Sequence, residues 1–281
     1  MAEAKHQPET MSRRKIALVI GVGDYKYTKK LKNATNDANA MASVLQSIGF
    51  IVIKKINPTH DEMETVLFKF KQSIHEGDMI LFYFSGHGVQ WEDQNFLIPK
   101  ENANNDDDAS IQQAVFSLNE MIIQMNDNAG ISLGKLKRYM IHVQGFLDDF
   151  SGRFPFVTIC LLDCCRVHFL RNPNLKKMTA KNPVADASKF SDKKAIVNAG
   201  LLIGFACEPG AEADDNEEQD NGLFTKHLLK HIVKPNKDIL KILNVVTGAV
   251  KEESSSRQVP YCTVSLLTED DICLCEKVSG T

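Results

Sequence analysis

The sequence predicts an α/β protein in three layers, in which a sheet of about six mostly parallel strands is covered by helices on both faces. Three observations predict this fold class. Short apolar runs of strand length alternate along the chain with segments whose apolar residues recur at helical spacing. Short connections join most of these segments, as in parallel sheets with right-handed crossover helices. The chain has 281 residues, 43% of them apolar and 25% charged, which is enough to bury one large core.

The first half of the chain predicts strand, helix, strand, helix and strand in that order. The run Lys15–Gly21 is aliphatic and β-branched, as expected of a strand that is buried on both faces. Asn33 or Asn36 is available to cap the first helix, and Thr59 with Glu62 forms a capping-box pattern before the second. The expected strands are 15–21, 50–56 and 79–85, and the expected helices are 33–48 and 59–75.

The second half continues the alternation beyond the segment 101–153. We expect buried strands at 156–163 and 201–206, helices at 222–232 and 238–251, and a last strand at 260–267. Three polar stretches, 101–110, 172–192 and 208–221, are too polar for a core and too long for tight turns, so we expect surface loops there. In an open α/β sheet ligands bind beyond the carboxyl ends of the strands, which is where chemistry should be sought.

Net charge, apolar run length and cysteine content argue against nucleic-acid binding, membrane anchoring and metal binding. The formal net charge is −3, which gives no broad positive field, so we expect no nucleic-acid partner. No apolar run approaches the roughly 20 residues that span a bilayer, and residues 1–14, which we expect to be flexible, lack the apolar block of a signal peptide. Seven unevenly spaced cysteines fit free thiols, and we expect a cytoplasmic protein without a membrane anchor or a metal.

Three predicted strands end in residues that could carry chemistry. The first ends in Gly21-Val22-Gly23, but the third glycine of a dinucleotide loop is missing, so a nucleotide-binding regulator remains only an alternative. The third ends in Ser-Gly-His-Gly, in which His87 stands between two glycines. The fourth ends in Asp-Cys-Cys-Arg, where Cys165 emerges from the strand. A thiolate needs a nearby proton acceptor, so a Cys-His dyad of Cys165 and His87 is chemically reasonable.

These residues resemble the boxes of a known family. YFSGHG at 83–88, followed by LLDCCR at 161–166 with Cys165 standing 78 positions after His87, resembles the His and Cys boxes of caspase-fold cysteine peptidases. The resemblance spans about residues 15–267. Within that clan the chain is most similar to paracaspases, because their nucleophile box also reads aspartate, one residue, cysteine, arginine. Metacaspases share SGHG but carry His-Ser-Gly after the nucleophile, where this chain has Arg-Val-His.

The resemblance implies roles for individual residues. His87 would be the general base or acid and Cys165 the nucleophile, with Cys164 only its neighbour. The backbone N–H groups of Gly88 and Cys165 would form the oxyanion hole. The implied fold is the caspase-like three-layer sandwich, with a large-subunit-like part at 15–170, a linker at 171–195, a small-subunit-like part at 196–267 and a tail at 268–281.

The resemblance also implies substrate preference. Paracaspases and metacaspases use acidic residues to hold Arg or Lys immediately before the scissile bond, and the matching positions here are Asp37, Asp163 and Glu212. Two or three carboxylates near a guanidinium favour a basic side chain. We therefore expect a cysteine endopeptidase that cleaves after Arg or Lys through an acyl-enzyme. A catalytically silent scaffold or dimerisation module is the alternative.

Four further expectations concern partners and regulation. Protein or peptide substrates are expected, and a homodimer would form through the last strand, around residues 261–266. The Lys-rich loop 172–194 is a candidate for self-cleavage by a Lys/Arg-specific enzyme. The segment 101–153 is expected to be an insertion relative to caspases. The acidic loop 212–220 offers calcium ligands but lacks an EF-hand pattern, so we expect a solvated face and no cofactor.

Overall fold

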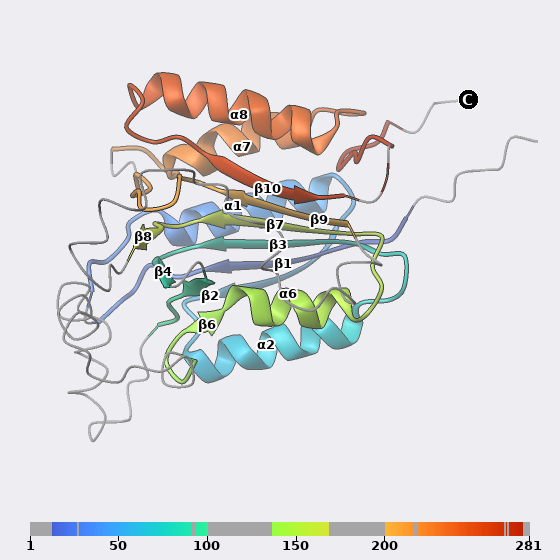
Figure 1. The fold of residues 1–281 in the computed structure, drawn as a ribbon, viewed down its shortest axis with the longest axis horizontal. Coiled ribbons are helices and arrows are strands. Elements are labelled where there is room, and N and C mark those ends of the chain that lie inside the picture. Colours follow the sequence, from blue (N-terminus) through green and yellow to red (C-terminus); the bar gives the residue numbers. More distant parts are fainter. Residues whose placement is uncertain are drawn as a thin grey trace, which may run out of the picture.

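A single twisted sheet forms the centre of the computed structural model, which describes residues 13–26, 28–91, 94–100, 137–168, 200–215, 218–266, 268 and 270–277. In this part of the chain six strands lie in the order β10-β9-β7-β3-β1-β2 (Figure 1). They are β1 (Lys15–Gly21), β2 (Ile51–Ile56), β3 (Met79–Ser85), β7 (Val157–Asp163), β9 (Gly200–Phe205) and β10 (Tyr261–Ser265). All neighbours pair in parallel except β10, which is antiparallel to β9. The predicted α/β fold with a mostly parallel sheet is confirmed.

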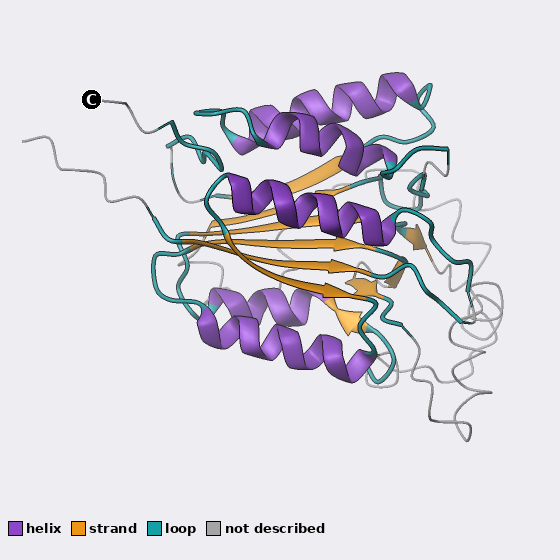
Figure 2. Ribbon diagram, turned by 180° about the vertical axis from the view of Figure 1, so that it is seen from behind, coloured by secondary structure: helices purple, strands orange, loops and turns teal. Residues whose placement is uncertain are grey.

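Helices cover both faces of this sheet. Figures 1 and 2 show α1, α7 and α8 on one face and α2 and α6 on the other. The helices are α1 (Ala34–Ser47), α2 (His60–Ser73), α6 (Val143–Ser151), α7 (Leu223–Ile232) and α8 (Ile239–Glu253). Alternate residues of the central strands point into two separate apolar cores, one under each helix layer. Every residue of β3 and β7 is therefore buried, as the sequence pattern predicts for strands covered on both faces.

Helix boundaries follow local capping chemistry. Thr59 and Glu62 form the predicted capping box at the start of α2. Asn33 occupies the position before α1 but makes no side-chain cap there; its side-chain N–H group donates to the carbonyl oxygen of Asp215 at 2.6 Å. Gly49 follows α1 with a positive φ of 91°, a backbone conformation that suits glycine. The sequence thus predicts these helices within one or two residues at either end.

A small second sheet and α6 are not predicted by the sequence. In the described residues the second sheet has the order β6-β5-β4-β8, and it stands at the carboxyl end of the main sheet. Its strands are β4 (Gly88–Trp91), β5 (Gln94–Leu97), β6 (Ile141–His142) and β8 (Val167–His168). Within the expected insertion 101–153, residues 141–151 form β6 and α6, and the insertion itself stays a prediction. The described residues do not include 101–136, the predicted linker 171–195 or the predicted self-cleavage loop 172–194.

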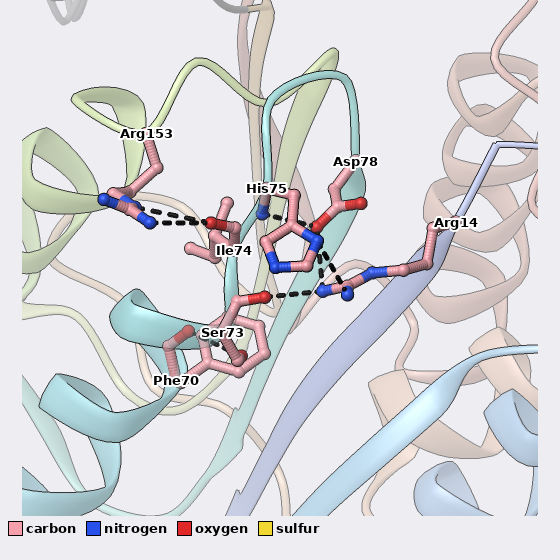
Figure 3. Close-up of polar contacts among 7 residues, drawn as sticks. All are labelled: Arg14, Phe70, Ser73, Ile74, His75, Asp78 and Arg153. Atoms are coloured by element: carbon pink, nitrogen blue, oxygen red, sulfur yellow. Dashed lines mark hydrogen bonds and ion pairs between the residues drawn. The ribbon is translucent and has the colours of Figure 1, made fainter.

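Charged side chains fix the opposite end of the sheet (Figure 3). Arg14, which precedes β1, pairs with Asp78, which precedes β3, at 3.0 Å. Arg14 also donates to the carbonyl oxygen of Ser73, and Arg153 donates to that of Ile74. These carbonyls belong to the last turn of α2 or directly follow it, where backbone acceptors lack partners within the helix. The network thus joins α2 to the amino ends of β1 and β3. It lies at the opposite end of the sheet from the strand ends where the sequence predicts the functional residues.

Candidate active site

His87 and Cys165 line one narrow cavity of about 30 Å³ at the carboxyl ends of β3 and β7. His87 follows β3 by two residues, and Cys165 follows β7 by two. The two strands pair in parallel, with Ser85 opposite Asp163, so both loops leave the sheet side by side. The structure therefore brings together the two residues that the sequence predicts as a dyad. Asp37 and Asp163 line the same cavity.

The His87 side chain is held by the loop after β1. Its Nε2 lies 2.6 Å from the carbonyl oxygen of Lys29. A carbonyl oxygen only accepts, so Nε2 carries a proton and Nδ1 is the acceptor in the neutral imidazole. The backbone N–H of His87 donates to the Tyr25 hydroxyl at 2.9 Å, and the two rings lie 4.5 Å apart. The Tyr25 hydroxyl in turn donates to the carbonyl oxygen of Ile98, so the loop, the histidine and the segment after β5 are connected.

Cys165 is a partly buried thiol with a backbone donor. Its Sγ accepts from the Ala213 N–H at 3.4 Å. Burial raises the pKa of the Cys165 thiol; the Ala213 N–H lowers it, and nearby carboxylates such as Glu212 raise it. The neighbouring Arg166 does not offset this effect, because its guanidinium lies over the Phe205 ring, 3.8 Å from the centroid. The resting group is a thiol that needs a base such as an imidazole before it can attack.

Cys164 and Gly88 pack closely together beside Cys165. Cys164 is buried, and burial raises the pKa of its thiol well above the ordinary value. A methyl group added at Gly88 would lie 2.5 Å from Cys164 Sγ and 3.1 Å from the carbonyl oxygen of Cys165. Only glycine fits at this distance. The backbone of Gly88 therefore lies against the backbone of the Cys165 loop, as two adjoining N–H donors would require.

Two buried carboxylates stand at the same cavity. Asp37, in the first turn of α1, accepts from Ser85 Oγ at 3.0 Å and from the backbone N–H of Gly222 at 3.0 Å. Asp163, the last residue of β7, accepts from Thr225 Oγ1 at 2.5 Å and from its N–H at 3.2 Å. Gly222 lies between them, since a Cβ there would be 3.1 Å from Asp37 Oδ2 and 3.3 Å from Asp163 Oδ2.

These two carboxylates share a poorly solvated site. Burial, together with the charge of Asp37, raises the pKa of Asp163 to about 8. Burial also raises the pKa of Asp37 to about 6, although hydrogen bonds from Asn221, Gly222 and Ser85 oppose the rise. Two negative charges close together in a buried site repel each other, and a cation placed between them relieves that repulsion. The cavity is therefore suited to a guanidinium or an ammonium group.

The third predicted carboxylate, Glu212, has a different position. Glu212 is exposed and does not line the cavity, whereas Asp215 from the same loop does. The Asp215 carboxylate accepts from the backbone N–H groups of Lys32 and Asn33 at 2.8 and 3.3 Å. Sequence reasoning also did not single out the Lys29 carbonyl or Gly222. Backbone groups leave no signal in a sequence, and only the spacing within an aligned loop would have pointed to Asp215.

The described residues contain neither a candidate metal site nor a helix that could span a membrane. Within residues 13–26, 28–91, 94–100, 137–168, 200–215, 218–266, 268 and 270–277, no three His, Cys, Asp or Glu side chains gather so that they could hold a metal ion. In the same ranges no helix combines the length and the apolar character needed to cross a bilayer. The loop 212–220 is described except at residues 216 and 217, so the expectation of no calcium there stays a prediction.

The sequence matches known proteins over most of its length. The protein-family model described as "Caspase domain" matches residues 14–271. Mucosa-associated lymphoid tissue lymphoma translocation protein 1 of Homo sapiens is 23% identical over 231 residues, which are 82% of this chain and 23% of that protein. Its homolog in Mus musculus has the same identity and coverage. The chain thus spans about a quarter of the length of these curated relatives.

Two further matches are more distant or shorter. Metacaspase-1 of Candida albicans is 27% identical over 124 residues, which are 40% of this chain and 27% of that protein. Among solved structures, the crystal structure of protein GSU0716 from Geobacter sulfurreducens superposes with a TM-score of 0.55 at 15% identity, covering 91% of this chain and 95% of that one. At that identity the structural match supports the fold alone.

Proposed function

This chain belongs to the caspase-domain family of cysteine peptidases, and on that premise we propose that it hydrolyses peptide bonds after Arg or Lys. Cys165 is the proposed nucleophile and His87 the proposed base. The observation that carries the proposal is one cavity lined by a thiol, an imidazole and two buried carboxylates, Asp37 and Asp163. The thiol and imidazole supply the chemistry, and the carboxylates supply the preference for a basic side chain.

The proposed reaction proceeds in two stages. His87 takes the proton from Cys165, and the thiolate attacks the carbonyl carbon of the scissile bond. Negative charge develops on the carbonyl oxygen, which the backbone N–H groups of Gly88 and Cys165 stabilise. The C–N bond then breaks as His87 returns its proton to the leaving amine, which leaves a thioester. Water attacks the thioester with His87 again as base, and the carboxylic acid product departs from the regenerated thiol.

The specificity proposal rests on the charge of the cavity. Asp37 and Asp163 are each held by donors from α7 or the turn before it, so their positions are fixed before a substrate arrives. An arginine or lysine side chain that enters the cavity beside them would replace a protonated carboxyl by an ion pair. An acidic side chain would meet two buried carboxylates and be rejected. Glu212 and Asp215 stand on the same loop, and both would add to the negative potential around the entrance.

Hydrolysis of peptide reporters tests this proposal. Reporters that end in arginine, lysine or aspartate should be compared with the purified protein and with its Cys165→Ala and Cys164→Ala variants. We expect cleavage after arginine and lysine only, complete loss in Cys165→Ala, and retained activity in Cys164→Ala. Equal activity of Cys165→Ala, or preference for aspartate, contradicts the proposal. An arginine-ended thiol-directed probe should label Cys165, and labelling of another cysteine instead would also contradict it.

A homodimer is a separate proposal about the edge of the main sheet. β10 is the terminal strand, and its residues are partly buried, with Val264 exposed by 38%. An edge strand presents backbone donors and acceptors that a second copy can pair with. Sedimentation of the purified chain tests it, with Thr263→Pro in β10 as the variant that disrupts edge pairing. We expect dimers for the parent chain and monomers for the variant; a monomeric parent chain contradicts the proposal.

A further inference from the structure

A buried chain of hydroxyl groups leads from β3 to the Asp163 carboxylate. The Tyr83 hydroxyl lies 2.5 Å from Thr225 Oγ1, and Thr225 Oγ1 donates to Asp163 Oδ2 at 2.5 Å. Tyr83 and Thr225 are both fully buried, and the cavity that Asp163 lines is not lined by either of them. A threonine hydroxyl has one proton, so while Thr225 donates to Asp163 the Tyr83 hydroxyl donates to Thr225. The donor direction therefore runs from Tyr83 through Thr225 to the carboxylate.

Tyr83 is a buried ionisable group that the proposed reaction does not use. Burial, together with the charges of Asp37 and Asp163, raises the pKa of Tyr83 well above its ordinary value, so its hydroxyl keeps the proton that it donates. Ser85, two residues further along β3, donates to Asp37 Oδ2 at 3.0 Å. Alternate residues of a strand share one face of the sheet. One face of β3 thus supplies a hydroxyl donor toward each carboxylate, directly from Ser85 and through Thr225 from Tyr83.

The two oxygens of the Asp163 carboxylate have different surroundings. Oδ2 accepts from both the hydroxyl and the backbone N–H of Thr225. Oδ1 makes no hydrogen bond with the residues that the structure describes, although Asp163 lines the cavity. Both oxygens of Asp37, by contrast, already accept hydrogen bonds from other residues. Asp163 Oδ1 is therefore the oxygen of the pair that a bound guanidinium can reach without displacing a donor.

We propose that Thr225 and Tyr83 are positioning residues for substrate selection, which hold Asp163 ionised and oriented so that its Oδ1 receives the Arg or Lys side chain before the scissile bond. This inference rests on the proposed function and adds the residues that prepare the selective carboxylate. Burial and the charge of Asp37 raise the pKa of Asp163 to about 8, and the hydrogen bonds from Thr225 oppose that rise. Loss of the Thr225 hydroxyl therefore moves the pKa of Asp163 further upward.

Other ionisable groups stand around Asp163, and the measurement has to separate them from it. They are Asp37 of α1, Tyr83 of β3, His87 after β3, Cys164 and Cys165 after β7, Cys207 after β9 and Asp215 before α7. From α7, Lys226 and His227 pair instead with Glu253 of α8. Asp37, with a raised pKa of about 6, gains its charge at lower pH than Asp163. A ratio of kcat/KM for two peptides that share the proposed base and nucleophile cancels the titration of those two groups.

The test compares a peptide that has arginine before the scissile bond with one that has its uncharged isostere citrulline there. Their kcat/KM ratio is measured from pH 6 to pH 9 in the parent chain and in Thr225→Val, Thr225→Ser and Tyr83→Phe. Valine and phenylalanine each remove a hydroxyl at nearly constant shape, whereas serine keeps it. The matched control is Thr158→Val. Thr158 is also fully buried and lies on β7 with Asp163, and its hydroxyl has no hydrogen-bond partner in the described part of the chain.

We expect the rise of the ratio with pH to move upward by about one pH unit in Thr225→Val, as loss of a hydrogen bond to a charged group would give. The pH dependence of kcat/KM reports the free enzyme, so at pH 7.5 the ratio should fall about fivefold, and the difference should shrink at pH 9. Tyr83→Phe should shift the ratio in the same direction by less. Thr225→Ser and Thr158→Val should match the parent chain.

The inference and the proposed function fail in different ways. If the parent chain prefers arginine and Thr225→Val keeps the parent pH profile, or lowers the ratio equally at every pH, the inference alone is overturned. An equal shift in Thr158→Val overturns it as well. Should thermal unfolding show that Thr225→Val is not folded, an unchanged pH profile in folded Tyr83→Phe has the same meaning. A parent chain that cleaves neither peptide, or cleaves both equally well, overturns both.

Discussion

Replacement of Asp163 by Asn should remove most of the preference for a charged side chain before the scissile bond. Asparagine keeps an acceptor oxygen for the N–H and hydroxyl of Thr225, which now donate to the Asp163 carboxylate. It has nearly the same volume as aspartate, so the cavity keeps its shape. At a pH above the Asp163 pKa of about 8, where the carboxyl is ionised, the change therefore removes one negative charge and little else. Burial raises the pKa of Asp163, which means that a neutral side chain is tolerated at this position.

The size of the effect follows from Coulomb attraction in a partly buried site. A guanidinium about 4 Å from a carboxylate gains on the order of 4 kcal/mol at an effective dielectric constant of 20. Desolvation of the two ions offsets roughly half of that gain. The remaining ~2 kcal/mol corresponds to a factor of about 30 in relative kcat/KM. Asp37→Asn should give a loss of the same order, because Asp37 lines the same cavity.

The assay compares two peptides that differ only in whether arginine or its uncharged isostere citrulline precedes the scissile bond. The ratio of their kcat/KM values reports the charge preference and cancels any general loss of activity. Asp78→Asn is the matched control, because Asp78 is also buried but lies at the opposite end of the sheet. We expect the ratio to fall about 30-fold in Asp163→Asn and to stay at the parent value in Asp78→Asn.

Two results would refute this reasoning. If the ratio in Asp163→Asn and in Asp37→Asn stays within about twofold of the parent value, the buried carboxylates do not cause the preference for a charged side chain before the scissile bond. If Asp78→Asn lowers the ratio as much as Asp163→Asn does, the effect is not specific to the carboxylates that line the cavity. Thermal unfolding of each variant, measured in parallel, separates a folded variant with altered selectivity from one that has lost its structure.

Three other changes should have measurable effects. Gly88→Ala should lower kcat/KM at least 100-fold, because its methyl group would lie 2.5 Å from Cys164 Sγ, and adding Cys164→Ala should restore part of the loss; a fully active Gly88→Ala enzyme contradicts this. Tyr25→Phe should lower kcat about tenfold in steady-state assays, because the buried N–H of His87 loses its acceptor, and an unchanged kcat would count against that role. The arginine-to-citrulline ratio should rise between pH 6 and pH 8, by at most about tenfold per pH unit, because the raised pKa of Asp163 leaves it increasingly ionised over that interval; a flat or falling ratio rejects this account.

Sequence patterning predicts the main sheet because its strands are buried on both faces. Lys15–Gly21 and Met79–Ser85 match β1 and β3 to the residue, since a continuous apolar run has clear ends. The small second sheet has strands of two to four residues, too short for any alternation to stand out. The helix Val143–Ser151 was missed for another reason: it lies within 101–153, which is expected to be an insertion, and no element was predicted there.

The candidate site, like the fold, was predicted from the sequence only in part. Strand ends predict which side chains share one rim of the sheet, and His87, Cys165 and Asp163 do line one cavity there. Contacts between loops were beyond prediction, because they depend on how distant segments pack. The Lys29 carbonyl at His87 is one such contact. The exposed position of Glu212 is another, since a shared motif fixes the order of residues in a loop but not which of them turns inward.

The parallel pairing of β4 with β8 holds the segments that follow His87 and Cys165 side by side, although the two residues are far apart in the sequence. Val89 lies opposite Val167, and Gln90 lies opposite His168, so the segments just after His87 and Cys165 are aligned by their own backbones. Whatever the number of residues between β5 and β6, this pairing keeps the segments after His87 and Cys165 side by side. The segment between β5 and β6 can therefore differ in length without changing how the segments after His87 and Cys165 are paired, which leaves that segment open to evolutionary change.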